Sequence, residues 1–193
     1  MLCGGRGDHD AGIEDAFKIS QGDGMDWWKQ IFDAFKDADV RQVAYVPDAG
    51  HAALIEACIG DNDIRTIALT TEEEGIAVLA GAWLGGVRGA LLMQSSGVGN
   101  CINMFSLATA CRFPLALFVT MRGQWREFNP WQTPMGQTTN SLLNTAGVQT
   151  LTATSPGDVS AMAVATLDQA FTGSGMSALL LHQRLMPVKT FDK

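Results

Sequence analysis

Residues 88–121, RGALLMQSSGVGNCINMFSLATACRFPLALFVTM, contain two nearly continuous apolar runs on either side of a segment with helical spacing. The runs RGALLMQ (88–94) and PLALFVTM (114–121) lack the alternation of apolar and polar residues that is typical of a strand with one solvated face. Strands with continuous apolar runs are buried on both faces, as in parallel sheets whose crossover helices cover the sheet above and below. This segment therefore predicts a strand–helix–strand unit of a parallel α/β sheet.

The same alternation of strand and helix extends to both sides of this unit. The order predicts a doubly wound, mostly parallel six-stranded sheet with helices on both faces. Further strands are expected at RQVAYVP (41–47), DIRTIALT (63–70), VQTLTA (148–153) and SALLLHQ (177–183). Helices are expected over 25–40 with Asp26 as cap, 51–60 ending at Gly60, 72–86, 99–111, about 138–146, and from Pro156 to about Phe171.

Composition narrows the classes of partner and location. The 193 residues carry a formal net charge of −7, a pI near 4.8 and no run of Lys or Arg, which argues against nucleic acid or an anionic membrane as partner. No apolar run approaches the roughly 18 residues that span a bilayer. The four cysteines form no CxxC pair and the N-terminus lacks the order of a signal peptide, so a reducing cytoplasm is the expected location.

Two segments are expected, a flexible N-terminal tail and one domain. Residues 1–24 are rich in Gly and Asp with little apolar periodicity, which predicts the tail. Residues 25–193 are expected to form the domain, and Met25 is a candidate natural start. The His, Cys and carboxylate residues show no metal-ligand spacing, so no metal site is predicted in this chain.

Ligands of a doubly wound sheet bind at the carboxyl ends of the strands, where the strand order reverses. The informative residues should therefore directly follow predicted strands. Four such loops are rich in Gly, polar groups or Trp, namely PDAGH (47–51), TTEEE (70–74), QSSGVGN (94–100) and RGQWREFNPWQTPMGQ (122–137).

Three consecutive glutamates open the helix expected over 72–86, which is otherwise almost wholly apolar. With Thr71 as cap, Glu74 completes a Thr-x-x-Glu capping box, and acidic groups in a first turn also interact favourably with the helix dipole. That box does not explain Glu72 or Glu73, and helical phase alone cannot choose between them. A structural origin of the triplet and a catalytic role for one member both stay open.

The other loops also allow a structural and a functional interpretation. QSSGVGN (94–100) could present backbone amides to an anion or a polar ring edge, or simply connect a strand to a helix tightly. Asp48 and His51 could contact a substrate, or act as turn-forming and capping residues. Arg122 and Arg126 could hold a carboxylate, sulfonate or phosphonate in bidentate fashion, or remain solvated.

Taken together, these motifs resemble the pyrimidine-binding domain of thiamine diphosphate enzymes of the 2-oxo acid decarboxylase type. The resemblance spans about residues 26–188 and rests on YVPDAG, TTEEEGIAVLAGAWLGG, LLMQSSGVGN and RGQWREFNPWQTPMGQTT. The last two motifs are most similar to the α subunit of sulfopyruvate decarboxylase and the related part of phosphonopyruvate decarboxylase. In that family a glutamate precedes a glycine by nine positions, and this register selects Glu72 through Gly81.

The resemblance implies a flavodoxin-like fold with Glu72 as the catalytic residue. Its carboxyl group would hydrogen-bond N1′ of the aminopyrimidine and favour the imino tautomer, whose nitrogen removes the C2 proton of the cofactor. Burial of that carboxyl group would favour the protonated, donating form, whereas a helix N-terminus favours the ionised form. The implied cofactor-binding residues are Glu72, Pro47, Ser96, Gly97, Val98, Gly99 and Asn100, and the substrate candidates are Asp48, His51, Arg122, Arg126 and Gln132.

The resemblance also implies a partner. The family binds diphosphate and Mg²⁺ through a Gly-Asp-Gly strand end, but QGDG (21–24) has no buried strand before it, so these ligands are expected on a diphosphate-binding β subunit. A hetero-oligomer with active sites at subunit interfaces would then decarboxylate a small anionic 2-oxo acid, such as 3-sulfopyruvate or 3-phosphonopyruvate. Two alternatives stay open, a noncatalytic nucleotide-binding or regulatory module on the same fold and a subunit of a thiamine-dependent carboligase.

Overall fold

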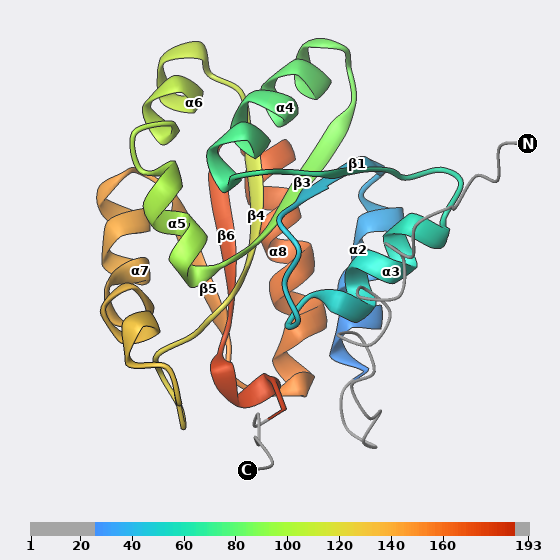
Figure 1. Ribbon diagram of the computed structural model, residues 1–193. Helices are drawn as coiled ribbons and strands as arrows, with labels where there is room; N and C mark the ends of the chain where they lie inside the picture. The colour runs from blue at the N-terminus through green and yellow to red at the C-terminus, as the bar shows by residue number, and fades with distance from the viewer. Residues whose placement is uncertain (1–25, 188–193) are drawn as a thin grey trace, which may run out of the picture.

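Six parallel strands form one sheet in the computed structural model, which describes residues 26–187 (Figure 1). The strand order is β2-β1-β3-β4-β6-β5, and every neighbouring pair is parallel. The predicted doubly wound sheet is thus confirmed. The strands are β1 (Val40–Tyr45), β2 (Arg65–Ala68), β3 (Arg88–Gln94), β4 (Leu115–Thr120), β5 (Gln149–Ala153) and β6 (Met176–Leu181). The predicted tail at 1–24 and its QGDG motif lie outside the described residues.

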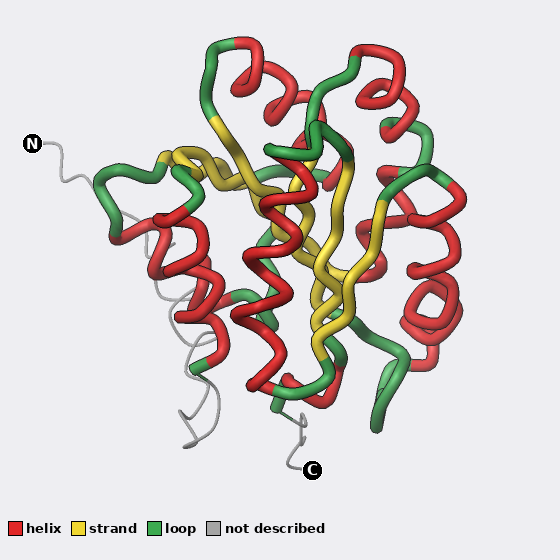
Figure 2. The backbone as a smooth tube through the Cα atoms, turned by 180° about the vertical axis from the view of Figure 1, so that it is seen from behind, coloured by secondary structure: helices red, strands yellow, loops and turns green. Residues whose placement is uncertain are grey.

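Helices cover both faces of the sheet, as Figures 1 and 2 show from opposite sides. One core cluster joins the sheet to α2 (Trp27–Asp37), α3 (Ala52–Gly60) and α8 (Val159–Phe171). A second cluster joins the opposite face to α4 (Glu72–Leu84), α5 (Ser95–Cys101), α6 (Phe105–Cys111) and α7 (Thr133–Thr145). Within residues 26–187, no helix combines the length and the hydropathy needed to cross a bilayer.

The strands that the sequence marks most strongly lie in the middle of the sheet. Every residue of β4 and of β6 is buried, and in β3 only the first and last residues are not. This burial follows from helices on both sides, which leave no solvated strand face for polar residues. On one side Phe35 of α2 packs its ring edge-to-face on Phe118 of β4, with 4.9 Å between the ring centroids.

Three local expectations differ from the structure. The single helix expected over 99–111 is two helices, and the first begins at Ser95, so the glycine-rich segment is helical rather than a turn. Between the two helices, the carbonyl oxygen of Asn103 accepts hydrogen bonds from both the N–H and the hydroxyl group of Ser106. The backbone bond spans three residues, as in a 3₁₀ turn, which is tighter than a turn of α-helix. Asp26 caps α2 with no side-chain bond, because its carboxylate accepts from Lys29 Nζ instead.

Helix α7 also begins earlier than expected, at Thr133 rather than near residue 138. It follows directly on a 3₁₀ turn, η2 (Pro130–Gln132), in which the Asn129 side chain accepts from the N–H of Trp131. Proline is tolerated in a first helical turn because its missing N–H has no intrahelical partner there. The two prolines at 130 and 134 therefore mark helix starts rather than a continuing loop.

The topology fixes where a ligand site can form. From β1 the chain crosses to β2 on one side, whereas β3, the next strand along the chain, pairs with the other side of β1. The carboxyl ends of β1 and β3 therefore flank the point at which the strand order reverses. The loop after β1, the start of α4 and the start of α5 all belong to this region.

The ring of Phe35 should contribute a large part of the core energy on the α2 face. We expect Phe35→Ala to lower the free energy of unfolding by about 3–5 kcal/mol, because the change removes a fully buried ring from a close-packed interior. Phe32→Ala on the same helix is the matched control, since Phe32 is only partly buried, and its loss should be less than half as large. Urea unfolding of both variants measures the difference, and equal losses would contradict this account of the core.

Candidate active site at the carboxyl edge of the sheet

The first residue of α4, Glu72, holds its carboxyl group between α4 and α5. The residue is only 9% exposed, and its Oε2 accepts a hydrogen bond of 2.7 Å from Asn100 Nδ2. A Cβ atom at Gly97 would lie 2.3 Å from both Cδ and Oε1 of Glu72, closer than real Cβ contacts. Any side chain at residue 97 would therefore displace the Glu72 carboxyl group from its present position.

The other two glutamates of the triplet have different surroundings. Oε2 of Glu74 accepts from the backbone N–H groups of Thr70 at 3.0 Å and Thr71 at 3.5 Å, which confirms its predicted place in a capping box. Glu73 is half-buried, and its Oε2 is buried without a partner among the described residues. Of the three, only Glu72 is a buried residue whose carboxyl group accepts a hydrogen bond from the neighbouring helix α5.

The thiol of Cys101 lies near these carboxyl groups but stays protonated. Burial raises its pKa to about 12, and the charges of Glu72 and Glu73 act in the same direction. A thiol with so high a pKa is a small apolar side chain rather than a nucleophile at neutral pH. Among residues 26–187, no group of His, Cys, Asp and Glu side chains could hold a metal ion.

A hydrogen-bonded network joins the carboxyl ends of three strands. Oδ1 of Asp48, in the loop after β1, accepts from Gln94 Nε2 at 3.0 Å, and its Oδ2 accepts from Thr120 Oγ1 at 2.6 Å. Ser96 Oγ then donates to Gln94 Oε1 at 3.0 Å. The network fixes the loop after β1 relative to the start of α5.

Two of these residues, Gln94 and Thr120, were not among the predicted site residues. Each is the last residue of its strand, and the sequence interpretation singled out side chains after the strand ends. The predicted run RGALLMQ ends in a polar residue, which was the available signal for Gln94. The predicted run PLALFVTM continues past Thr120 to Met121, so no such signal marked Thr120.

His51 lies beneath this loop rather than at its surface. It is 1% exposed, and its Nε2 is 3.0 Å from the carbonyl oxygen of Phe118, so the neutral ring donates there through Nε2–H. Burial lowers the pKa of His51, which keeps the imidazole neutral. Its Nδ1 is buried without a partner among the described residues. These contacts anchor the loop, and a role of His51 toward a substrate stays a prediction.

Arg122, in the loop after β4, is paired with Glu127. Its Nε and Nη2 donate to the two carboxylate oxygens at 2.7 and 2.5 Å, and the side chains are only 15% and 6% exposed. Gln183 Nε2 adds a third donor to Glu127 at 2.9 Å. The bidentate face of Arg122 is thus engaged within the chain, whereas Arg126 is exposed and forms no salt bridge with the residues that the structure describes.

The remaining predicted residues lie around the same edge with different exposure. Pro47, Gly99 and Asn100 are exposed, Ser96 is half-buried, and Gly97 and Val98 are buried. Gln132 is 8% exposed, with its Oε1 buried and without a partner in the described part of the chain. The loop after β4 also exposes three large rings, those of Trp125, Phe128 and Trp131.

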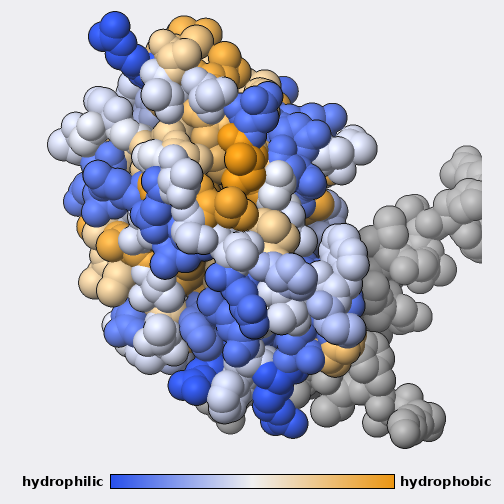
Figure 3. All heavy atoms as spheres, turned by 90° about the vertical axis from the view of Figure 1, so that its left-hand side faces the viewer, coloured by the Kyte–Doolittle hydropathy of each residue, from blue (hydrophilic) through white to orange (hydrophobic). Residues whose placement is uncertain are grey.

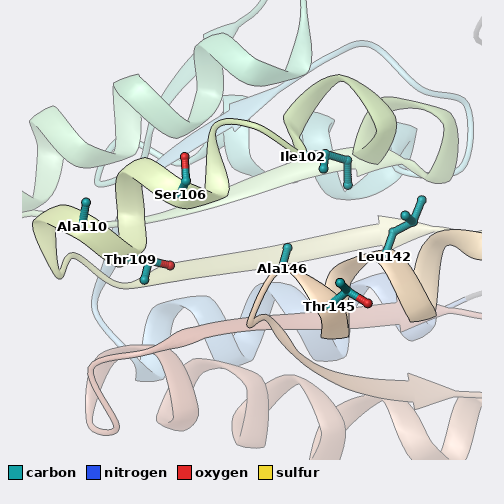
Figure 4. A pocket seen from close by; sticks show the side chains of 7 residues that line it. All are labelled: Ile102, Ser106, Thr109, Ala110, Leu142, Thr145 and Ala146. Atoms are coloured by element: carbon teal, nitrogen blue, oxygen red, sulfur yellow. The ribbon is translucent and has the colours of Figure 1, made fainter.

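An apolar groove of about 440 Å³ lies elsewhere, between α6 and the C-terminal half of α7 (Figure 4). Figure 3 faces the side of the molecule on which these helices lie and shows a band of apolar surface there. The groove is lined by Ile102, Ser106, Thr109, Ala110, Leu142, Thr145 and Ala146. None of the predicted site residues lines it, so it is separate from the site around Glu72.

Comparison with known proteins identifies relatives that are all named as decarboxylases. The chain is 41% identical over 119 residues to "Sulfopyruvate decarboxylase subunit alpha" of Methanococcus maripaludis, covering 61% of this chain and 71% of that protein. It is 37% identical over 121 residues to the protein of the same name from Methanocaldococcus jannaschii, covering 62% of this chain and 72% of that protein. It is also 40% identical over 107 residues to "Phosphonopyruvate decarboxylase" of Streptomyces viridochromogenes, covering 54% and 27%. No protein-family model matches the sequence.

Solved structures share the fold. A 2-oxoglutarate:ferredoxin oxidoreductase from Magnetococcus marinus superposes with a TM-score of 0.68 at 14% identity, over 82% of this chain and 29% of that chain. A benzoylformate decarboxylase from Polynucleobacter necessarius also gives 0.68 at 14% identity, over 86% and 33%. At this identity the likeness concerns the fold, and in both cases this chain corresponds to a part of a longer polypeptide.

The Arg122–Glu127 pair should make stability depend on acid pH. Burial alone would raise the pKa of Glu127, but hydrogen bonds from Arg122, Asn129, Gly123 and Gln183 outweigh it and lower the pKa to about 2. A lowered folded-state pKa contributes stability that is present above the unfolded-state value and is lost as pH falls through the folded-state value. The window is therefore about pH 4.5 down to about 2.

We expect Glu127→Gln to cost on the order of 2 kcal/mol of unfolding free energy at pH 7, since Arg122 would lose its carboxylate partner. The difference from wild type should shrink as pH falls from about 5 to about 2. Urea unfolding across this range measures it. Asp39→Asn, which breaks an exposed pair with Arg41, is the control and should change stability far less. A difference that is constant with pH would contradict the assignment.

Proposed function

This chain belongs to the family of sulfopyruvate decarboxylase α subunits, and on that premise we propose that it is the pyrimidine-binding subunit of a thiamine diphosphate-dependent decarboxylase. Its substrate is a small anionic 2-oxo acid such as 3-sulfopyruvate or 3-phosphonopyruvate. The observation that carries the proposal is the carboxyl group of Glu72, buried against Gly97 at the switch point of the sheet. A carboxyl group in that place is what the aminopyrimidine of the cofactor requires as a partner for N1′.

The residues around Glu72 fit a flat heterocycle. Gly97 has no side chain, and Val98 beside it is fully buried, so this part of α5 presents backbone next to the carboxyl group. Ser96, Gly99 and Asn100 complete the segment, and Pro47 stands on the neighbouring loop after β1. These residues would hold the pyrimidine ring beside the Glu72 carboxyl group.

When bound, the cofactor supplies a carbon nucleophile for the 2-oxo group and an electron sink for the bond to CO₂. The chain's own task is to hold a proton at the Glu72 carboxyl group and donate a hydrogen bond to the ring nitrogen. Ile76, one turn further along the same helix, is fully buried. Exclusion of water favours the neutral carboxyl group, whereas the helix N-terminus favours the charged one, so the site must be enclosed to work.

The substrate anion needs a cation at the same edge of the sheet. Arg122 is engaged by Glu127, whereas Arg126 in the same loop is exposed with no salt bridge among the described residues. This difference favours Arg126 over Arg122 as the partner of a sulfonate or phosphonate. Gln132, with a buried Oε1 that no described residue bonds, is a further candidate toward the substrate.

A separate β subunit would bind the diphosphate and Mg²⁺. This chain covers 71% of the α subunit from M. maripaludis but only 27% of the phosphonopyruvate decarboxylase from S. viridochromogenes. The longer relative thus has room for the other half of the site in one polypeptide. The same division supports an enzyme that is active only as a hetero-oligomer, with its active sites at subunit interfaces.

Helix α4 offers a surface for that partner. Its outward side carries Ala77, Gly81 and Leu84, and Leu84 is 87% exposed. A Cβ at Gly81 would meet no atom within 4 Å, so nothing inside the chain requires a glycine there. Glycine in a helix interior costs about 1 kcal/mol relative to alanine, and close approach of a second helix would explain it. The surface lies on the same helix as Glu72, as a shared active site requires.

Replacement of Glu72 tests the proposed function. We expect Glu72→Gln to abolish decarboxylation of 3-sulfopyruvate and 3-phosphonopyruvate by the reconstituted pair, because the amide cannot exchange the carboxyl proton. Assembly with the partner should be unchanged, as measured by size-exclusion chromatography. A wild-type rate in this variant, or nucleotide binding by the isolated chain that does not depend on Glu72, would overturn the proposal in favour of a noncatalytic module.

Replacement of Gly81 tests the partner surface. We expect Gly81→Leu to leave the thermal stability of the isolated chain unchanged or higher, because the side chain enters open space and leucine favours the helix. The same variant should weaken assembly with the partner at least tenfold in a titration of the two subunits. Val164→Leu, at an exposed position of α8, is the control and should not affect assembly. Wild-type assembly by Gly81→Leu would exclude this side of α4.

A further inference from the structure

The amide of Asn100 is the group in direct hydrogen-bond contact with Glu72. Asn100 is exposed on α5, and its Nδ2 donates to Oε2 of Glu72, a residue 28 positions earlier in the chain. Glu72 itself is only 9% exposed. The bond length is 2.7 Å, at the short end expected for an N–H donor to a carboxyl oxygen. An exposed side chain with many rotamers is thus held in one geometry by the buried acid.

The two oxygens of Glu72 are therefore not equivalent. Oε2 accepts from Asn100, whereas Oε1 lies against Gly97 and accepts no hydrogen bond from any residue in the range 26–187. A primary amide donates through nitrogen and cannot accept there, so a proton on Oε2 would face a donor. The neutral carboxyl group consequently carries its proton on Oε1.

We propose that Asn100 is a positioning residue that holds Oε2 of Glu72 as an acceptor and so assigns the cofactor-facing proton to Oε1. The inference rests on the proposed function, because it names the oxygen of Glu72 that serves N1′. Asn100 acts through Glu72 and not on the reacting atoms. It fixes the rotation of the carboxyl group about its last side-chain bond, so that the donated hydrogen bond has one direction.

Two substitutions separate this role from a merely structural one. Asn100→Ala removes the donor and frees the carboxyl group. Asn100→Asp keeps the shape but replaces the donor with an acceptor, which would draw the Glu72 proton to Oε2, the wrong oxygen. Asn103→Ala is the matched control, because Asn103 is an exposed asparagine of the same segment outside the site, and only its backbone carbonyl is used.

The first measurement needs no cofactor. Carbon-13 NMR of the full chain, with the Glu72 signal assigned by its absence in Glu72→Gln, follows the pH at which this carboxyl group titrates. Loss of a donor disfavours the ionised form, so the midpoint should rise in Asn100→Ala. It should rise further in Asn100→Asp, where two carboxyl groups share one site, and it should not move in Asn103→Ala.

The second measurement is turnover by the reconstituted holoenzyme, with deuterium exchange at C2 of the cofactor as a readout of activation. We expect kcat to fall about tenfold in Asn100→Ala with little change in KM, since the hydrogen bond that orients the carboxyl group is lost. In Asn100→Asp both kcat and the rate of deuterium exchange should fall further, although the variant is isosteric. A structural role predicts the opposite order, because the isosteric change would be the milder one.

Three results would overturn the inference. These are wild-type kcat and exchange in Asn100→Ala, higher activity in Asn100→Asp than in Asn100→Ala, or an unchanged titration midpoint of Glu72 in both variants. Loss of folding is excluded by thermal melting, and the cofactor-free titration remains available if assembly is impaired. If Glu72→Gln is inactive while the Asn100 variants are not, only this inference fails. If Glu72→Gln is active, the proposed function fails first.

Discussion

The contact between the Glu72 carboxyl group and Gly97 is the constraint on which the candidate site depends. For this contact, α4 must begin with Glu72 at the carboxyl edge of the sheet, directly after β2. Helix α5, which follows β3, must have a glycine at its third residue, Gly97. Because β2 and β3 lie on either side of β1 and are parallel to it, both helices start at the same carboxyl edge of the sheet. The fold thus brings an acid and a bare stretch of backbone together from segments that are far apart in sequence.

Much of the fold could be predicted because its signals are local. Continuous apolar runs such as PLALFVTM identify strands with helices on both faces, and the capping role of Glu74 follows from its spacing to Thr71. Boundaries were less predictable. Gly97 and Gly99 indicated a turn, yet the segment is helical, since the space for Glu72 and not the backbone conformation explains Gly97.

The contacts that decide the site could be predicted only in part. Glu72 was selected by the family resemblance, through its register with Gly81, but its bond to Asn100 joins residues whose proximity depends on the packing of α4 on α5. The same holds for Arg122. The sequence shows only that Arg122 is a cation in an acidic chain. In the structure it forms a salt bridge with Glu127, which also accepts a hydrogen bond from Gln183. Interactions across a loop of this kind leave no periodic signal in the sequence.

The energetics of Glu72 connect the catalytic proposal to subunit assembly. A carboxyl group at a helix N-terminus that accepts a hydrogen bond from an amide is stabilised in its charged form. The proposed donor role needs the neutral form, and only removal of water on the open side can shift the balance. This chain encloses one side of the carboxyl group, where Gly97 of α5 lies against it. In the proposed enzyme the outer wall would come from the cofactor and the partner, and the acid would then be competent only in the assembled enzyme.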